Sequence, residues 1–185
     1  SSSTTSWWKK TQPRKTKTNN SHRETAIGPF PKQSKTMKRI AIFPGSFDPF
    51  TIGHASIVER GLPLFDEIVI GVGVNENKRA LYTAEERVEH IRQLYADEPR
   101  VRVVSYSDLT IDLAHREGAK FILRGLRSVK DFEYERDIAS MNQRLGDVET
   151  VLLFTDPNYL SISSSVVREL IAFGKDVTDF LPKKK

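Results

Sequence analysis

The sequence predicts an α/β fold, a single domain with a doubly wound (Rossmann-like) sheet of five parallel strands and helices on both faces. Segments rich in β-branched residues alternate along the chain with segments whose apolar residues recur at helical spacing. The segment 67–74 is apolar at nearly every position, which is typical of a parallel strand covered on both faces. The chain has 185 residues, a length that suits one domain with a tail.

The first strand is expected at residues 39–44 and ends at a Pro-Gly pair. A helix is expected at 53–65, where Ile57 and Val58 begin an apolar pattern with helical spacing. Pro63 marks the end of this helix, because proline has no amide hydrogen to donate.

The second strand, at 67–74, leads to a helix at 83–95. Thr83 and Glu86 have the spacing of a capping box, in which each side chain accepts from the other residue's amide. A third strand is expected at 101–105.

The remaining segments continue the alternation. A short helix at 110–117 is ended by Gly118, because glycine readily adopts the left-handed conformation that follows a helix. The other expected elements are a strand at 120–123, a helix at 129–142, a strand at 150–155 and a helix at 166–173.

Residues 1–36 differ from the rest of the chain. They hold eight of the 29 basic groups and one of the 24 acidic groups, which leaves 21 basic and 23 acidic groups in 37–185. The net charge of +5 therefore comes from this segment, which is rich in Ser, Thr and Lys and has no apolar period. We expect a disordered leader or tag before a folded domain at 37–185. A transit peptide and a nucleic-acid-binding arm that stacks Trp7 and Trp8 on bases are the alternatives.

The composition excludes several classes of protein. The chain has no Cys, which excludes a disulfide framework, a thiolate nucleophile and a cysteine-based zinc site. Its apolar stretches are far shorter than the roughly 18 residues of a membrane-spanning helix, so no membrane partner is expected.

The strand-to-helix joint PGSFDPFTIGH, at 44–54, carries the first candidate site. Ser46 offers a hydroxyl, Gly53 leaves room for a phosphate, and His54 falls in the first helical turn, where free amides and the helix dipole favour anions. A Gly/Pro turn with a capping His is the alternative. The joint has neither the Walker nor the dinucleotide-binding glycine pattern.

Two further segments follow strands and carry phosphate-binding residue types. Arg124 and Arg127 can fork onto phosphate oxygens, and Gly125 between them would permit a tight turn that faces both toward a crevice. Three hydroxyls at 163–165 precede a helix, although such a triplet also serves as a helix cap. Lys78 is another candidate cation, with a solvated surface position as its alternative.

These motifs resemble those of a known superfamily. TIGH at 51–54 and ISSSVVR at 162–168 resemble the two signatures of the nucleotidyltransferase α/β-phosphodiesterase superfamily. RGLRSVKDFEYE at 124–135 makes the chain similar to bacterial phosphopantetheine adenylyltransferases in particular. The resemblance spans residues 37 to about 182.

The resemblance implies that 37–185 is a nucleotidyltransferase domain. It would transfer AMP from ATP to 4′-phosphopantetheine, giving dephospho-coenzyme A and pyrophosphate, by in-line attack of the acceptor phosphate on the ATP α-phosphate. It further implies Mg²⁺ delivered with ATP, no metal held by the protein alone, a homohexamer, feedback binding of coenzyme A, a cytoplasmic location and no nucleic-acid partner.

The resemblance also implies roles for individual residues. His54 would stabilise the transition state, and Lys78, Arg127 and Ser46 would be the other catalytic groups. The acceptor would be bound by Ser46, Lys78, Thr110, Arg124 and Asn142. ATP would be bound by Ser46, Phe47, His54, Gly125, Leu126, Arg127, Glu135, Tyr159, Leu160, Ser161, Ile162, Ser163, Ser164 and Ser165.

Other functions remain open from the sequence. Another adenylyl- or cytidylyltransferase could use the same scaffold. A nucleic-acid-binding module could use the basic segment at 1–36, and a steep loss of affinity with salt would mark it. A nucleotide sensor without catalytic activity is the third alternative.

Overall fold

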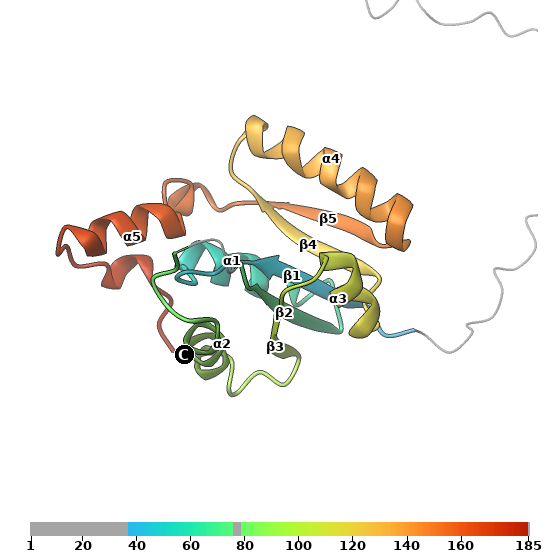
Figure 1. Cartoon of the computed structure of the whole chain (residues 1–185), viewed down its shortest axis with the longest axis horizontal. Coiled ribbons are helices and arrows are strands. Elements are labelled where there is room, and N and C mark those ends of the chain that lie inside the picture. The colour runs from blue at the N-terminus through green and yellow to red at the C-terminus, as the bar shows by residue number, and fades with distance from the viewer. Residues whose placement is uncertain (1–36, 76–78, 185) are drawn as a thin grey trace, which may run out of the picture. The chain divides into compact units, whose positions relative to one another are not determined.

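The computed structural model describes residues 37–75 and 79–184, which fall within one compact unit of the chain, Met37–Lys185. The expected leader or tag at 1–36 and the expected catalytic Lys78 lie outside the described residues. Strands and helices alternate (Figure 1) in the order β1 (Ile40–Gly45), α1 (Ile52–Gly61), β2 (Glu67–Gly73), α2 (Ala84–Leu94), β3 (Val101–Tyr106), α3 (Thr110–Arg116), β4 (Phe121–Leu126), α4 (Val129–Gly146), β5 (Glu149–Phe154) and α5 (Ser164–Ala172).

The five strands form one parallel sheet in the order β3-β2-β1-β4-β5. The central strand β1 pairs with β2 on one side and with β4 on the other, so the chain reverses its direction of winding at β1. This arrangement confirms the predicted doubly wound, five-stranded sheet. In such sheets ligands bind outside the carboxyl ends of the strands at the reversal point, which here lies between β1 and β4.

Helices cover both faces of the sheet, as predicted. Helices α1 and α2 contribute Val58 and Ile91 to a core that also contains Ile70 of β2. Helix α3 contributes Leu113 to a second core around Val69. Helix α4 packs against α3, β4 and β5, so it lies on the second face. Because side chains of successive strand residues point to opposite faces, Val69 and Ile70 belong to different cores.

Local signals place several boundaries correctly. The Thr83 hydroxyl accepts from the Glu86 amide at 3.2 Å, and the Glu86 carboxylate accepts from the Thr83 amide at 2.8 Å, which confirms the predicted capping box. Gly118 has φ +66° just after α3, as expected for a helix terminator. Pro63 follows the end of α1 at Gly61, so this helix is shorter than the predicted 53–65.

Three other boundaries differ from the prediction by two residues or more. Strand β4 continues to Leu126 instead of ending at 123, because it pairs with β5 along this whole stretch. Helix α4 runs on from 142 to Gly146, and Asp147 ends it in the left-handed conformation with φ +51°. Helix α5 begins at Ser164, two residues earlier than predicted, since Ser163 caps it.

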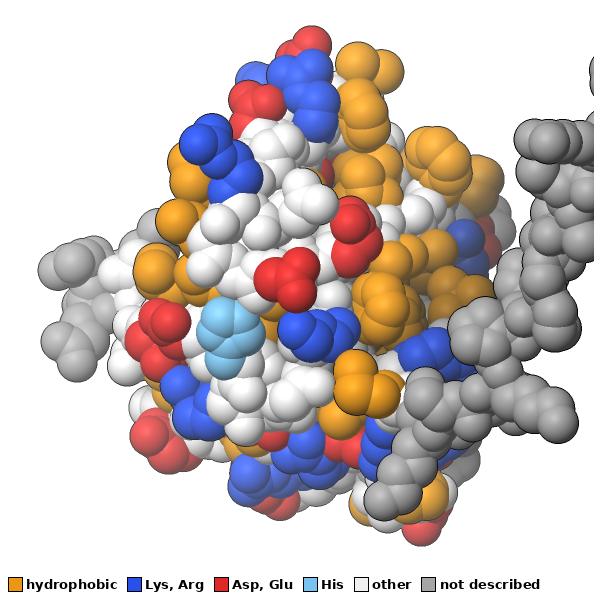
Figure 2. Space-filling model, turned by 90° about the vertical axis from the view of Figure 1, so that its right-hand side faces the viewer, with side chains coloured by type: hydrophobic (Ala, Val, Ile, Leu, Met, Phe, Trp, Pro, Cys, Tyr) orange, Lys and Arg blue, Asp and Glu red, His pale blue; other side chains and the backbone are white. Residues whose placement is uncertain are grey.

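One side of α4 stays exposed although it is apolar. Tyr134 retains 64% of its accessible surface and Met141 retains 53%. Figure 2 shows hydrophobic side chains gathered on one region of the face that it presents.

No helix within residues 37–75 and 79–184 is long and apolar enough to cross a membrane.

Candidate active site

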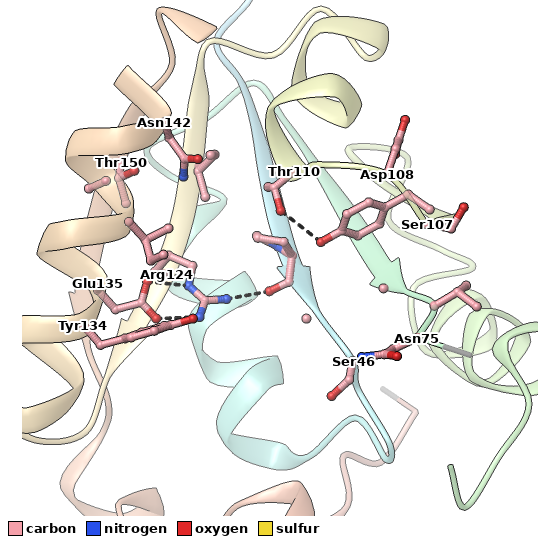
Figure 3. A pocket seen from close by; sticks show the side chains of 18 residues that line it. Ser46, Asn75, Ser107, Asp108, Thr110, Arg124, Tyr134, Glu135, Asn142 and Thr150 are labelled. Atoms are coloured by element: carbon pink, nitrogen blue, oxygen red, sulfur yellow. Dashed lines mark hydrogen bonds and ion pairs between the residues drawn. The ribbon is translucent and has the colours of Figure 1, made fainter. Parts of the chain in front are cut away.

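Two adjoining cavities open at the carboxyl ends of β1 and β4. The first, of about 490 Å³, lies between the β1–α1 joint, the end of β4 and the start of α5, and we call it the nucleotide cavity after the ligand that the resemblance implies. The second, of about 360 Å³, lies between β1, α3 and α4 and is called the acceptor cavity (Figure 3). Five residues line both cavities, namely Pro44, Gly45, Ser46, Arg124 and Glu135.

The structure brings most of the expected site residues to these cavities. The nucleotide cavity is lined by Ser46, Phe47, His54, Arg124, Gly125, Arg127, Glu135, Ile162, Ser163, Ser164 and Ser165. The acceptor cavity is lined by Ser46, Thr110, Arg124, Glu135 and Asn142. Segments separated by more than 100 residues in the sequence therefore meet at one edge of the sheet, as the resemblance implies.

Four expected ATP-binding residues line neither cavity. Leu126 lies on β4 with its side chain buried in the interior. Tyr159 ends a short 3₁₀ helix, and Leu160 and Ser161 follow it with exposed side chains. These side chains lie outside the two cavities in this conformation.

His54 occupies the first turn of α1, as its spacing from the Gly-rich joint predicts. The backbone amide of Thr51 donates to its Nδ1 at 3.0 Å, and the Thr51 hydroxyl lies 3.1 Å from the same nitrogen. A nitrogen that accepts from an amide carries no proton, so the hydrogen of the neutral imidazole lies on Nε2. Thr51 therefore fixes the tautomer that leaves Nε2–H as a donor.

Aromatic rings surround the imidazole and keep it from being charged. The His54 ring centre lies 5.1 Å from that of Phe47 and 5.4 Å from that of Phe50. Burial, followed by the positive charges of Arg127 and Arg124, lowers the pKa of His54 from 6.5 to about 4. His54 is therefore neutral at neutral pH and can donate from Nε2 without carrying a charge.

The lowered pKa of His54 predicts a dependence of stability on pH. Between pH 6.5 and about 4 the unfolded chain binds a proton at His54 that the folded domain does not, so the free energy of unfolding should fall as pH falls. We expect a loss of about 2 kcal/mol, less than the full shift implies because water reaches the cavity. Urea unfolding measured at a series of pH values tests this.

Two histidine variants separate this effect from the titration of other groups. His54→Asn should remove the loss of stability between pH 6.5 and 4. His90→Asn, which changes an exposed histidine on α2, should keep it. Equal pH dependence in His54→Asn and the unmodified chain would contradict the assignment.

The loop between β1 and α1 is held by contacts that the sequence analysis did not identify. The Asp48 carboxylate is buried and accepts from the amides of Leu81 at 2.8 Å and Tyr82 at 3.0 Å. Arg168 of α5 donates to the Asp48 carbonyl at 2.6 Å. Asp48 and Arg168 stand inside the motifs DPF and ISSSVVR, so proximity to a motif was the only available signal. These contacts fix the loop that carries Ser46 and leads to His54.

Arg124 lies within β4 and bridges the two cavities. Its Nε donates to one Glu135 oxygen at 2.9 Å, its Nη2 donates to the other, and its Nη1 donates to the Pro44 carbonyl at 2.8 Å (Figure 3). The Glu135 carboxylate is buried, whereas the Arg124 side chain retains 30% of its accessible surface. Glu135 thus orients a guanidinium that both cavities share, besides its expected contact with ATP.

Gly125 lies within strand β4 and not in the tight turn that the sequence analysis expected. At this position a Cβ atom would approach Ile57 of α1 to 3.1 Å and 3.2 Å. The absent side chain lets α1 pack closely on the sheet. This close packing brings the first turn of α1, with His54, next to the end of β4.

Arg127, just after β4, and the three serines at the start of α5 line the nucleotide cavity. Arg127 follows β4 and forms an ion pair with Asp131, leaving its own side chain 46% exposed. Ser163 caps α5 by accepting from the Val166 amide, and Ser164 donates to the Pro49 carbonyl at 2.8 Å. Ser165 accepts from Arg168. Ser163 therefore confirms the suggested helix cap, and the triplet also lines the cavity where the resemblance implies contact with ATP.

The acceptor cavity has one polar and one apolar wall. On the α3 side, the Tyr106 and Thr110 hydroxyls lie 3.1 Å apart (Figure 3). On the α4 side, Tyr134 and Ile138 line it beside Asn142. This combination suits a ligand with both amide or hydroxyl groups and an aliphatic chain.

No group of three or more His, Cys, Asp or Glu side chains suited to a metal ion occurs in the described parts of the chain. The carboxylates that line the nucleotide cavity, Asp131 and Glu135, are each paired with an arginine. A divalent cation at this site would therefore take most of its ligands from phosphates and water, which is usual for Mg²⁺ bound with a nucleotide.

Comparisons with known proteins identify the fold and the family. The cytidylyltransferase-like family model matches residues 42–170. A crystal structure of a bifunctional NMN adenylyltransferase/ADP ribose pyrophosphatase from Francisella tularensis, complexed with AMP and Mn ion, superposes with a TM-score of 0.61 at 14% identity. The match covers 80% of this chain and 46% of that chain, and it shows that the two share a fold.

Sequence relatives are much closer. Phosphopantetheine adenylyltransferase of Phocaeicola vulgatus is 59% identical over 145 residues, which cover 78% of this chain and 96% of the relative. The protein of the same name from Bacteroides fragilis is 57% identical over 145 residues, covering 78% and 97%. Since more than half of the aligned residues are identical over nearly the whole of each relative, the chain belongs to the phosphopantetheine adenylyltransferase family.

Proposed function

We propose that this chain transfers the AMP group of ATP to the phosphate of 4′-phosphopantetheine. An acceptor phosphate oxygen attacks the α-phosphorus and forms the new P–O bond. The bond between the α-phosphorus and the oxygen that bridges it to the β-phosphorus breaks, and pyrophosphate leaves with the electron pair. The products are dephospho-coenzyme A and pyrophosphate.

The observation that carries this proposal is the meeting of two cavities at Ser46 and Arg124. One cavity is lined by cationic groups and hydroxyls, which suit a triphosphate, and the other has the mixed walls that suit a pantetheine arm. A phosphate placed at the shared residues would lie beside the nucleotide α-phosphate. This arrangement supports direct transfer between two bound reactants.

The acceptor phosphate is already an anionic nucleophile, so the reaction needs no general base. Catalysis then depends on holding two anions together and stabilising charge on the transferring phosphoryl group. We propose that Nε2–H of His54 donates a hydrogen bond to the transferring phosphoryl group. Thr51 occupies only the other ring nitrogen, Nδ1. Arg127 with the serines of α5 would hold the triphosphate. Arg124 with Ser46 and Lys78 would hold the acceptor phosphate, and Thr110 and Asn142 would contact the pantetheine arm.

We further propose that Mg²⁺ arrives with ATP and is held mainly by its phosphates. When bound, it would neutralise part of the phosphate charge. The donor set at the nucleotide cavity fits this arrangement, because Asp131 and Glu135 are each paired with an arginine and do not form a closed metal site.

Product analysis tests the proposed reaction. Pure protein, Mg²⁺ and 4′-phosphopantetheine are mixed with ATP or with CTP, and the products are identified by mass. We expect dephospho-coenzyme A and pyrophosphate with ATP only. The cytidylyltransferase-like family match makes CTP the informative alternative. Nicotinate mononucleotide, supplied with ATP in place of the acceptor, should give no product.

The same assay after deletion of residues 1–36 should give the same rate, since all the proposed groups lie between Ser46 and Ser165. A nucleic-acid-binding function of the basic segment would instead appear as salt-sensitive binding to DNA or RNA that the deletion removes.

We propose that the chain forms a homohexamer, with the apolar side of α4 buried between subunits. Large patches of exposed apolar surface on soluble domains commonly mark interfaces. The exposed hydrophobic residues of α4 are Val129, Phe132, Tyr134, Ile138, Met141 and Leu145. Feedback binding of coenzyme A, which shares the pantetheine arm, and a cytoplasmic location complete the proposal.

A charge placed on α4 tests the assembly. Met141→Glu should produce smaller particles in light scattering, because a buried carboxylate without a partner strongly disfavours an interface. Leu64→Glu changes a residue of similar exposure beyond α1 and serves as the control. Particles of unchanged mass with Met141→Glu would contradict the use of this surface.

A further inference from the structure

Helix α2 carries a buried guanidinium that the proposed mechanism does not use. Arg87 retains 6% of its accessible surface. Its Nε donates to the Thr83 carbonyl at 3.3 Å, and its Nη1 donates to the carbonyls of Ser46 and of Gly73, the latter at 3.2 Å. One side chain thereby joins the β1–α1 loop, the end of β2 and the start of α2.

The partners of Arg87 are unusual for a buried cation. Within residues 37–75 and 79–184, no carboxylate forms an ion pair with it, and its named partners are backbone carbonyls. Burying a charge is costly unless polar groups compensate it, and carbonyl dipoles supply that compensation here. The Thr83 contact stays within the first turn of α2, whereas the contacts to Ser46 and Gly73 reach other elements and call for another explanation.

Both longer-range contacts lead to the proposed acceptor-phosphate site. Ser46 lines both cavities, and Gly73 lines the acceptor cavity. Asp48 independently ties the β1–α1 loop to the residues just before α2, by accepting from the Leu81 and Tyr82 amides. The Arg87 side chain itself lines neither the nucleotide cavity nor the acceptor cavity, so it does not reach the reacting groups.

We propose that Arg87 is a positioning residue for acceptor-phosphate binding. It holds the Ser46 backbone against the end of β2, which fixes the separation between two parts of the wall of the acceptor cavity, at Ser46 and at Gly73. The inference rests on the proposed adenylyl transfer. It adds to that proposal a residue that acts on the acceptor through Ser46 and leaves the triphosphate contacts of Arg127 and α5 untouched.

The test compares Arg87→Met and Arg87→Lys with Arg92→Met. Arg92 lies on the same helix and donates to the Val103 carbonyl at 3.0 Å, away from both cavities, so it is a matched loss of an arginine–carbonyl contact. Steady-state kinetics for 4′-phosphopantetheine and calorimetric binding of ATP without acceptor are measured well below each variant's unfolding temperature.

We expect Arg87→Met to lower kcat/KM for the acceptor by roughly 10- to 100-fold, the scale of a misplacement of about 1 Å. The Kd for ATP should change less than about threefold, because most proposed triphosphate contacts are unaffected. Arg87→Lys keeps the charge and should recover part of the loss, and it replaces Arg87→Met if that variant does not fold. Arg92→Met should behave as the unmodified chain.

Two results would overturn the inference. One is unchanged kcat/KM for the acceptor in Arg87→Lys and in any folded Arg87→Met. The other is an equal loss of ATP affinity, which would indicate a general structural defect. Hydrogen exchange without substrates gives a readout independent of the reaction: amides of 45–48 and 73–75 should lose protection in Arg87→Met. If the unmodified chain makes no dephospho-coenzyme A, the proposed function fails, whereas the exchange result still reports on the Arg87 contacts.

Discussion

Replacing His54 with Ala is expected to lower kcat by about 10²–10³-fold, the usual cost of removing one donor to a transition state. The imidazole is neutral, its Nδ1 accepts from Thr51, and its Nε2–H is left to donate. A neutral donor binds the ground-state phosphates weakly compared with the charge that develops during transfer. The loss should therefore fall on kcat, with KM for both substrates changed much less.

Steady-state rates of pyrophosphate release, measured for both substrates, test this expectation. His90→Ala, at an exposed position on α2, is the matched control and should keep full activity. Below pH 6, His54→Ala should unfold at a denaturant concentration similar to or higher than that of the unmodified chain. The variant lacks the histidine that takes up a proton in the unfolded chain but not in the folded domain. A kcat within threefold of the unmodified chain would exclude the proposed donation.

The fold was largely predictable because its signals are local. Apolar runs locate all five strands, and the capping box locates α2 at Thr83. The extension of β4 was not predictable in this way. Arg124 and Gly125 interrupt the apolar run before Leu126, and Arg124 belongs to the strand only because it pairs with Leu152 on β5. Strand ends set by a partner distant in sequence leave no periodic signal.

In the candidate site, too, only the features that depend on local spacing were predictable. The TIGH spacing places His54 in the first turn of α1, where the structure has it. The contacts that hold the site come from elsewhere. Arg87 reaches Ser46 across 41 residues, and Arg168 reaches Asp48 across 120. Such contacts depend on the packing of whole elements, so residue type and spacing could not reveal them.

The buried pair of Arg124 and Glu135 predicts a large and strongly non-additive effect on stability. Glu135→Leu removes the carboxylate that neutralises Arg124, and Arg124→Met leaves the Glu135 charge buried. Arg124→Met should lower the free energy of unfolding by about 3 kcal/mol, because the Glu135 charge stays buried without a partner. Glu135→Leu should cost less, because Arg124 keeps 30% of its side-chain surface and its contact with the Pro44 carbonyl. The double variant should be more stable than either, since no charge is left uncompensated.

Activity should not follow stability through this series. The double variant lacks the guanidinium that the two cavities share, so it should fold well and still bind the acceptor poorly. Denaturant unfolding of all four proteins, combined with kcat/KM for 4′-phosphopantetheine, separates the two effects. The exposed pair of Arg100 and Glu98, changed to Met and Leu in the same way, should show much weaker coupling. Additive losses of stability at Arg124 and Glu135 would mean that Glu135 does not compensate the charge. Recovery of activity in the double variant would mean that Arg124 does not bind the acceptor phosphate, because the charge would then have been dispensable.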